Sequence, residues 1–224
     1  SDRVRGLAID TAGNIYATGQ TQNTAFPTTV GAFDQTYNGG EDGFVTKLNP
    51  AGSALVYSTF LGGIGRDEPF AIDLATNNDA FIAGETTGPL TFPLRNSLNG
   101  TNGTIFLTRI NSDATALVFS SLLGQGGAYD VDSDAQGNAY ITGHTTSIAV
   151  TLGAFQTMKG DASSTSSQKD AYVLKIAPTD ENVTAYSISG TVTDPTQFGN
   201  YQPITVTITG TVSRSYILPY GSGS

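Results

Sequence analysis

The amino-acid sequence predicts an all-β protein made of three tandem repeats of about 60 residues, followed by a C-terminal β-strand extension. The composition favours strands and turns, because the chain has 27 Gly, 10 Tyr and 11 Phe among 224 residues, and only 13% of its residues are charged. Short segments alternate between apolar and polar residues and are separated by Gly, Asn, Asp and Pro. The same order of segments recurs three times along the chain.

The composition also excludes several kinds of site and partner. The absence of Cys and the single His, His144, exclude a disulfide scaffold, a thiolate metal site and a multi-histidine zinc centre. The formal net charge of −9 disfavours nucleic acid and anionic lipid as partners. No segment approaches the roughly 20 apolar residues of a membrane span, so we expect no membrane insertion.

Each repeat begins with two strands joined by a short polar connection. Residues 8–21 contain this pattern, which returns at residues 71–86 and 130–145. Asp and Asn in the connection can bond to nearby backbone, and Gly tolerates a positive φ. Aligning the three copies on their sequence makes two sets of residues equivalent: Asp10, Asp73 and Asp132 in the connection, and Gly19, Gly84 and Gly143 near the end of the second strand.

The second half of each repeat supplies two further strands. Residues 43–63 contain them in the first copy, residues 105–124 in the second and residues 171–190, with weaker agreement, in the third. A cation recurs in the third strand, where its stem covers apolar surface and its charge bonds to a carbonyl or carboxylate of a neighbouring loop. Aromatic residues recur in the second strand, and the loops at Phe26 and Phe92 add others, which we expect to pack between repeats. The recurring cations are Lys47, Arg109 and Lys175, and the recurring strand aromatics are Tyr16, Phe81 and Tyr140.

Four strands per unit, repeated in tandem, predict β-propeller-type blades. Their approximate ranges are 1–63, 64–127 and 128–190. At residues 26–33, 42–50 and 55–63 the sequence resembles the SBBP-type β-propeller repeat family of bacterial and archaeal exported or surface proteins. The resemblance covers about residues 1–190. It implies propeller architecture and an extracellular or cell-surface location, as a processed or truncated chain, and it supplies no catalytic residues.

Three blades are fewer than the four to eight that typically close a propeller ring. Further repeats, other copies of the chain or the extension at residues 191–224 are the alternatives for covering the open sides. The extension resembles the start of an Ig-like module and contains alternating apolar residues, which predict a half-buried strand. We expect this strand to add to the edge of a blade in the same or a neighbouring chain and to drive assembly. Its apolar positions are Ile204, Val206 and Ile208.

Two acidic patterns are candidate sites. Alternating oxygen ligands before Gly137 are typical of part of a calcium loop, although Gly143 stands where its final carboxylate would be, and a plain Asx turn is the alternative. The adjacent acidic pairs at residues 41–42 and 67–68 are interpreted as solvated loop carboxylates, because neighbouring side chains on a strand point to opposite faces. The candidate calcium ligands are Asp130, Asp132, Asp134 and Gln136.

The function predicted from the sequence is structural. His144 stands at the place of Gln20 and Glu85, so no catalytic role is expected of it, and no nucleophile, base and orienting group form a constellation. The sequence predicts a non-enzymatic extracellular or cell-surface repeat protein for structure or adhesion, without a cofactor other than calcium. Neighbouring repeats or chains would complete it, for example as a surface filament subunit. The alternatives are a polysaccharide-binding module and a propeller enzyme that acts on polysaccharide.

Overall fold

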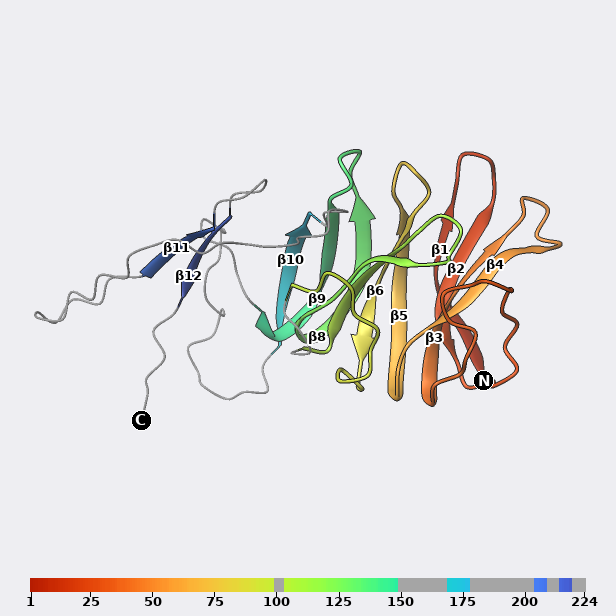
Figure 1. Ribbon diagram of the computed structural model, residues 1–224, viewed down its shortest axis with the longest axis horizontal. Helices are drawn as coiled ribbons and strands as arrows, with labels where there is room; N and C mark the ends of the chain where they lie inside the picture. The colour runs from red at the N-terminus through yellow and green to blue at the C-terminus, as the bar shows by residue number, and fades with distance from the viewer. Residues whose placement is uncertain (99–102, 149–168, 178–203, 209–213, 219–224) are drawn as a thin grey trace, which may run out of the picture. The chain divides into compact units, whose positions relative to one another are not determined.

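The structure, a computed structural model, describes residues 1–98, 103–148, 169–177, 204–208 and 214–218 (Figure 1). This part of the chain contains strands and no helix, as the sequence predicts. The chain divides into two compact units, Ser1–Ala149 with Asp161–Asp180, and Val150–Gly160 with Glu181–Ser224. The strands of the first unit are β1 (Asp2–Ile9), β2 (Ile15–Thr21), β3 (Gly40–Leu48), β4 (Leu55–Leu61), β5 (Gly65–Leu74), β6 (Ala80–Thr86), β7 (Ile105–Ile110), β8 (Leu117–Ser133), β9 (Ala139–Ile148) and β10 (Asp170–Ile176).

The first unit consists of antiparallel meanders that follow one another along the chain (Figure 1). β1 to β4 pair in sequence order and form the first meander. β5, β6, β7 and residues 117–124 of β8 repeat this order as the second meander. β8 then continues without a break, and its residues 124–133 pair with β9, which pairs with β10, in the third meander. The sheet does not close on itself, and the strand expected at residues 183–190 lies outside the described residues.

A bulge at the same place in the first strand of every meander sets the register. The unpaired residues are Arg5, Phe70 and Tyr129.

Counted from these bulges, Asp10 corresponds to Ala75 and Asp134, whereas Asp73 and Asp132 correspond to Ala8. The sequence-based equivalence of Asp10 with Asp73 and Asp132 is therefore wrong by two residues. The three strand connections also have equal length, because each spans the five residues between paired strand ends. Backbone pairing sets these positions, and similar residues two places apart misled the sequence alignment.

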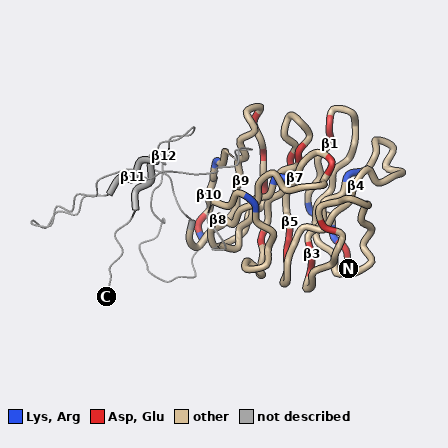
Figure 2. The backbone as a smooth tube through the Cα atoms, in the orientation of Figure 1, with Lys and Arg blue, Asp and Glu red and all other residues tan. Residues whose placement is uncertain are grey.

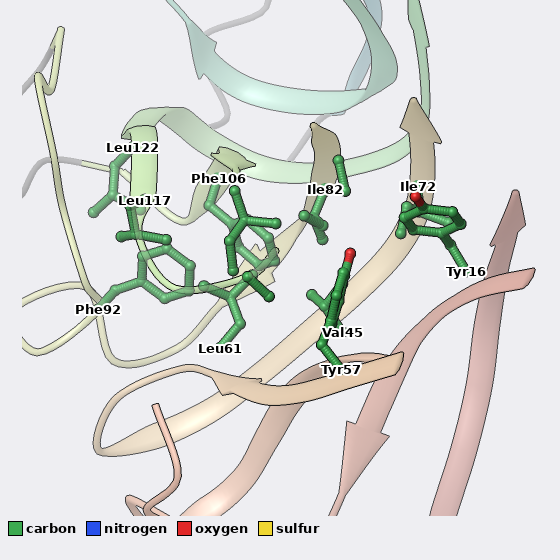
Figure 3. Close-up of a cluster of buried hydrophobic side chains, with 13 residues drawn as sticks. Tyr16, Val45, Tyr57, Leu61, Ile72, Ile82, Phe92, Phe106, Leu117 and Leu122 are labelled. Carbon is green, nitrogen blue, oxygen red and sulfur yellow. The ribbon is translucent and has the colours of Figure 1, made fainter. Parts of the chain in front are cut away.

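Two apolar cores hold successive meanders face to face. The first core joins the first and second meanders, and Figure 3 shows side chains from both sides meeting: Tyr16, Val45, Tyr57 and Leu61 from one, and Ile72, Ile82, Phe106, Leu117 and Leu122 from the other. The second core joins the opposite side of the second meander to the third: Phe81, Ile105, Leu107 and Phe119 pack with Val131, Ala139, Ile141 and Ile176. Burial of each large apolar side chain contributes about 1.5–3 kcal/mol, so these cores dominate the stability of the unit.

The loop after the second strand adds an aromatic ring to the sheet. Phe92 belongs to the first core and stacks on Phe106 with the ring centroids 4.6 Å apart, so it packs between repeats as the sequence predicts. Its counterpart Phe26 stacks on Phe44 at the same separation and lies 5.9 Å from Phe60. Phe44 corresponds to Phe106, so Phe26 covers part of the side of the first meander that faces away from the second meander.

The second unit contains β11 (Ile204–Ile208) and β12 (Arg214–Leu218), which form a separate two-stranded antiparallel sheet. The strand predicted around Ile204, Val206 and Ile208 is thus confirmed. Among the described residues β11 pairs with β12, and its pairing with the edge of a blade in the same or a neighbouring chain stays a prediction. A partner a few residues away along the chain closes the ladder at a low cost in loop entropy, which explains the local pairing.

Candidate functional site

A cation, a carboxylate and an aromatic ring meet in the first repeat. Lys47 Nζ lies 3.4 Å from Asp10 Oδ2 and 4.6 Å from the centroid of the Tyr16 ring. The Tyr16 hydroxyl donates a hydrogen bond to the same carboxylate oxygen at 3.2 Å. The backbone amides of Ala12 and Asn14 donate to Asp10 Oδ1, which ties the carboxylate into the strand connection. These contacts hold the connection after β1 to Tyr16 on β2 and to Lys47 on β3.

The third repeat builds the same constellation from Asp134, Tyr140 and Lys175. The Tyr140 hydroxyl donates to Asp134 at 2.9 Å, and Lys175 Nζ lies 3.9 Å from that carboxylate and 5.1 Å from the Tyr140 ring. Hydrogen bonds, first of all from the Asn138 side chain, lower the pKa of Asp134 to about 2. Burial opposes the charge of Asp10, yet hydrogen bonds from Asn14 and the nearby lysine lower its pKa to about 2 as well. Both carboxylates are therefore ionised at neutral pH.

The second repeat moves the carboxylate to the other end of the connection. Ala75 stands where the other repeats have Asp, and Asp79 stands where they have Asn. Arg109 donates to Asp79 Oδ2 from Nε at 3.0 Å and pairs with it through Nη2 at 2.8 Å, and its guanidinium lies 5.5 Å from the Phe81 centroid. Both charged side chains are more than nine-tenths buried. The second repeat thus has both a different position for the acid and Arg in place of Lys, and the Arg side chain pairs with the acid at its new position. Only comparison of the three repeats reveals that the two changes go together.

The candidate calcium ligands do not converge. Asp134 accepts hydrogen bonds from backbone and side-chain donors on its two oxygens, whereas among the described residues Asp130 and Asp132 each accept one from the next backbone amide. Within the part of the chain that the structure describes, no group of three or more acidic or His side chains is placed to hold a metal ion. Gln136 contributes its backbone amide to the turn at Asp134. The geometry is that of an Asx turn, so the calcium interpretation of these four residues is not supported.

The recurring glycines make room for the bulges. Gly19, Gly84 and Gly143 lie opposite the bulges of their meanders, and a Cβ on any of them would overlap a backbone carbonyl oxygen of the first strand. In the second repeat that carbonyl belongs to Glu68, and the Phe106 ring closes in from the other side at 2.6 Å. Glycine is required here by close backbone approach, which is a general cause of Gly within strands.

Two aspartates are buried where the first meander meets the second. Asp42 and Asp67 are fully buried, each has one oxygen, Oδ1, without a hydrogen-bond partner, and the other oxygen accepts a backbone amide, from Asn38 and Gly63 respectively. Burial raises the pKa of Asp67 to about 6. Burial, with added repulsion from Asp67, raises the pKa of Asp42 to about 6. The interpretation of these acids as solvated loop carboxylates is wrong, because both lie in strands that an adjacent meander covers.

We expect the pH dependence of stability to report these two groups. A carboxyl whose pKa is about 6 in the folded chain and 3.8 otherwise binds more protons when folded, so the free energy of unfolding falls as the pH rises from about 4 to 6. Asp67→Asn is expected to stabilise the protein by about 2 kcal/mol at pH 7.5 and to change it little near pH 4. Urea unfolding at both pH values measures this. A variant that loses stability equally at both values would contradict the assignment.

A polar network lies beside these aspartates on β1, β2, β3 and β5. The Gln20 side-chain amide donates to Glu68 at 2.7 Å, and Arg66 pairs with Glu68 at 2.6 Å and with Glu41 at 2.8 Å. Arg5 adds a longer contact of 3.5 Å to Glu68. Figure 2 shows the acidic and basic positions distributed along the strands of the first unit. The network offers charge pairing between repeats and contains no nucleophile with a neighbouring base.

Comparison with known proteins bears on the first two strands. A family model described as an SBBP β-propeller repeat matches residues 1–27, which span β1, β2 and the start of the following loop. No curated protein matches the chain. The described residues contain no helix that is long and apolar enough to cross a membrane.

Proposed function

Because residues 1–27 carry an SBBP β-propeller repeat, we propose that the chain is a non-enzymatic structural repeat protein whose three meanders are propeller blades. Its role is that of a scaffold or adhesion component in an extracellular or cell-surface assembly. The apolar cores between successive meanders support this proposal. The charged clusters described above support it as well, because their side chains pair with other groups of the fold. Another blade, supplied by a second copy of the chain, completes the array.

The observation that carries the proposal is an exposed apolar face on the first meander. Leu7 is 60% exposed, whereas its counterpart Ile72 is 7% exposed because it packs against the preceding meander. Leu55 is 38% exposed, whereas its counterpart Leu117 is 5% exposed in the same core. Ile9 extends the exposed face along β1. The first meander thus presents the surface that the second uses to bind a blade.

The third meander supplies a complementary surface. Val45 and Leu107 are fully buried because they face the next meander, and their counterpart Val173 on β10 is 77% exposed. Packing this surface on the Leu7 face of a second copy repeats, between chains, the contact that joins the blades within a chain. Such a head-to-tail contact is heterologous and forms either a closed ring or an open filament.

The solution mass tests the proposal. We expect light scattering after gel filtration to give a mass at least twice the 23.2 kDa of one chain, and Leu7→Asp with Ile9→Asp to reduce it to one chain. Val30→Ser is the matched control, because Val30 is fully exposed in the loop between β2 and β3. A wild-type chain that stays monomeric at about 100 μM, or an assembly that persists in the double variant, overturns the proposal.

A further inference from the structure

Arg5 fills a small cation site between the first and second repeats. Its guanidinium carbon lies 5.4 Å from the centroid of the Phe70 ring. Its Nε donates to Gln20 at 3.2 Å, and its Nη2 lies 3.5 Å from Glu68. A cation over a ring face beside a carboxylate is the usual geometry of cation–π recognition. The chain therefore contains, at this junction, an example of how it binds a guanidinium group.

The next junction, between the second and third repeats, has the ring and a carboxylate but a different set of residues. Counted from the bulges, Tyr129 takes the place of Phe70, and Phe70 takes the place of Arg5. Glu85 takes the place of Gln20, and Gly127 that of Glu68. The acid has thus moved from one strand to its neighbour, and the residue that supplied the cation has become a phenylalanine.

Three side chains converge above the backbone of Gly127. A Cβ on this glycine would lie 3.1 Å from Glu85 Oε2 and 3.4 Å from ring carbons of both Tyr129 and His144. The Tyr129 ring lies 5.4 Å from Phe70 and 5.2 Å from His144, centroid to centroid. Tyr129 is 52% exposed, so a molecule in solution can reach the cluster. Because Gly127 has no side chain, nothing from this position covers the Glu85 carboxylate.

The Glu85 carboxylate has no cationic partner in the part of the chain that the structure describes. Among the described residues its side chain makes no hydrogen bond or ion pair, whereas the acids of the first junction, Glu41, Asp42, Asp67 and Glu68, all have partners. His144 does not supply the charge, because burial, together with the nearby positive charge of Lys169, lowers its pKa. Glu85 is therefore a half-buried carboxylate beside two rings, without an ion-pair partner among the described residues, in a chain of net charge −9.

We propose that Glu85, Tyr129 and His144 form a binding site for the guanidinium group of a ligand, which pairs with Glu85 and lies against the exposed part of the Tyr129 ring, because Phe70 already fills the place that corresponds to Arg5. Glu85 supplies the charge, and Tyr129 supplies the ring face. The net negative charge of the chain draws cations toward the site. Both a free guanidinium compound and an arginine side chain of a partner protein carry this group. The site requires only the second and third repeats and is independent of the assembly proposed above.

Titration of the whole chain with agmatine, followed by NMR, tests the site. We expect saturable shifts of the Gly127 amide and the His144 ring protons, with a dissociation constant of order 1 mM, and weaker binding as salt is added. A short peptide with a central arginine forms the second arm. Stronger binding of the peptide identifies a partner protein as the source, and equal binding identifies a small molecule.

The decisive variant is Glu85→Gln, because Gln20 shows that the fold accepts glutamine at this place. We expect it to weaken agmatine binding at least tenfold, and Tyr129→Leu to weaken it as well. Asp132→Asn removes one exposed charge from the third repeat and should leave binding unchanged. Shifts that do not saturate, equal binding in the Gln variant, or an equal loss in the Asp132 variant would each overturn the site in favour of general charge attraction.

Discussion

Arg109→Ala is expected to destabilise the protein by about 3–5 kcal/mol, because it leaves the buried Asp79 carboxyl without its partner. The equivalent cation of the third repeat offers a matched control. Lys175 is 54% exposed, and its Nζ lies 3.9 Å from Asp134, so Lys175→Ala should cost less than about 1 kcal/mol. Urea unfolding at pH 7 compares the two variants directly.

The double variant separates the loss of a charge pair from the loss of packing. Asp79→Asn introduces the residue that the other two repeats carry at this place, so Arg109→Met with Asp79→Asn removes both charges and keeps most of the volume. We expect it to recover at least half of the stability lost in Arg109→Ala. Equal losses for the Arg109 and Lys175 variants would show that burial of the pair contributes nothing.

Gly84→Ala is the second change with a large expected effect. The added methyl group would overlap the Glu68 carbonyl oxygen and lie 2.6 Å from Phe106. Relief requires β5 and β6 to separate at the bulge, and we expect a loss of about 3 kcal/mol or more, at the upper end for overpacking. Thermal unfolding followed by circular dichroism measures this loss as a lower midpoint temperature.

Gly52→Ala is the control for the backbone effect of adding a side chain. Gly52 has a φ of 66° with nothing near its Cβ position, so its substitution is expected to cost about 1 kcal/mol from backbone strain alone. If both variants lost the same stability, the close contact at Gly84 would have no energetic weight.

Local pattern was enough to predict most strands. Alternation and turn residues predict β2 and β3 to within a few residues, and three alternating apolar positions predict the strand at Ile204. The bulges were missed because an extra unpaired residue leaves no mark in composition, although the repeated Gly19 and Gly84 were a signal of close backbone approach. Missing them shifted Asp73 and Asp132 by two residues relative to Asp10.

The polar sites were predicted less well than the strands. The sequence identifies the recurring cations Lys47, Arg109 and Lys175 and predicts a loop carbonyl or carboxylate beside them. In the second repeat the acid is Asp79, at the end of the connection between β5 and β6, and its partner is Arg109. Only the folded chain shows that this end of the connection faces the cation. The buried state of Asp42 and Asp67 likewise depends on a neighbouring meander about 25 residues away along the chain.

The sequence by itself determined that the chain is all-β, that its units recur at about 60 residues and which residue types recur in them, because strand alternation and turn chemistry are local properties. Only the tertiary structure decided the register, the pairing of β11 with β12 and the burial of Asp42 and Asp67. It also decided which equivalent residues differ in exposure, as Leu7 and Ile72 do. Burial and exposure depend on contacts between segments far apart in the chain, where equivalent residues have different neighbours.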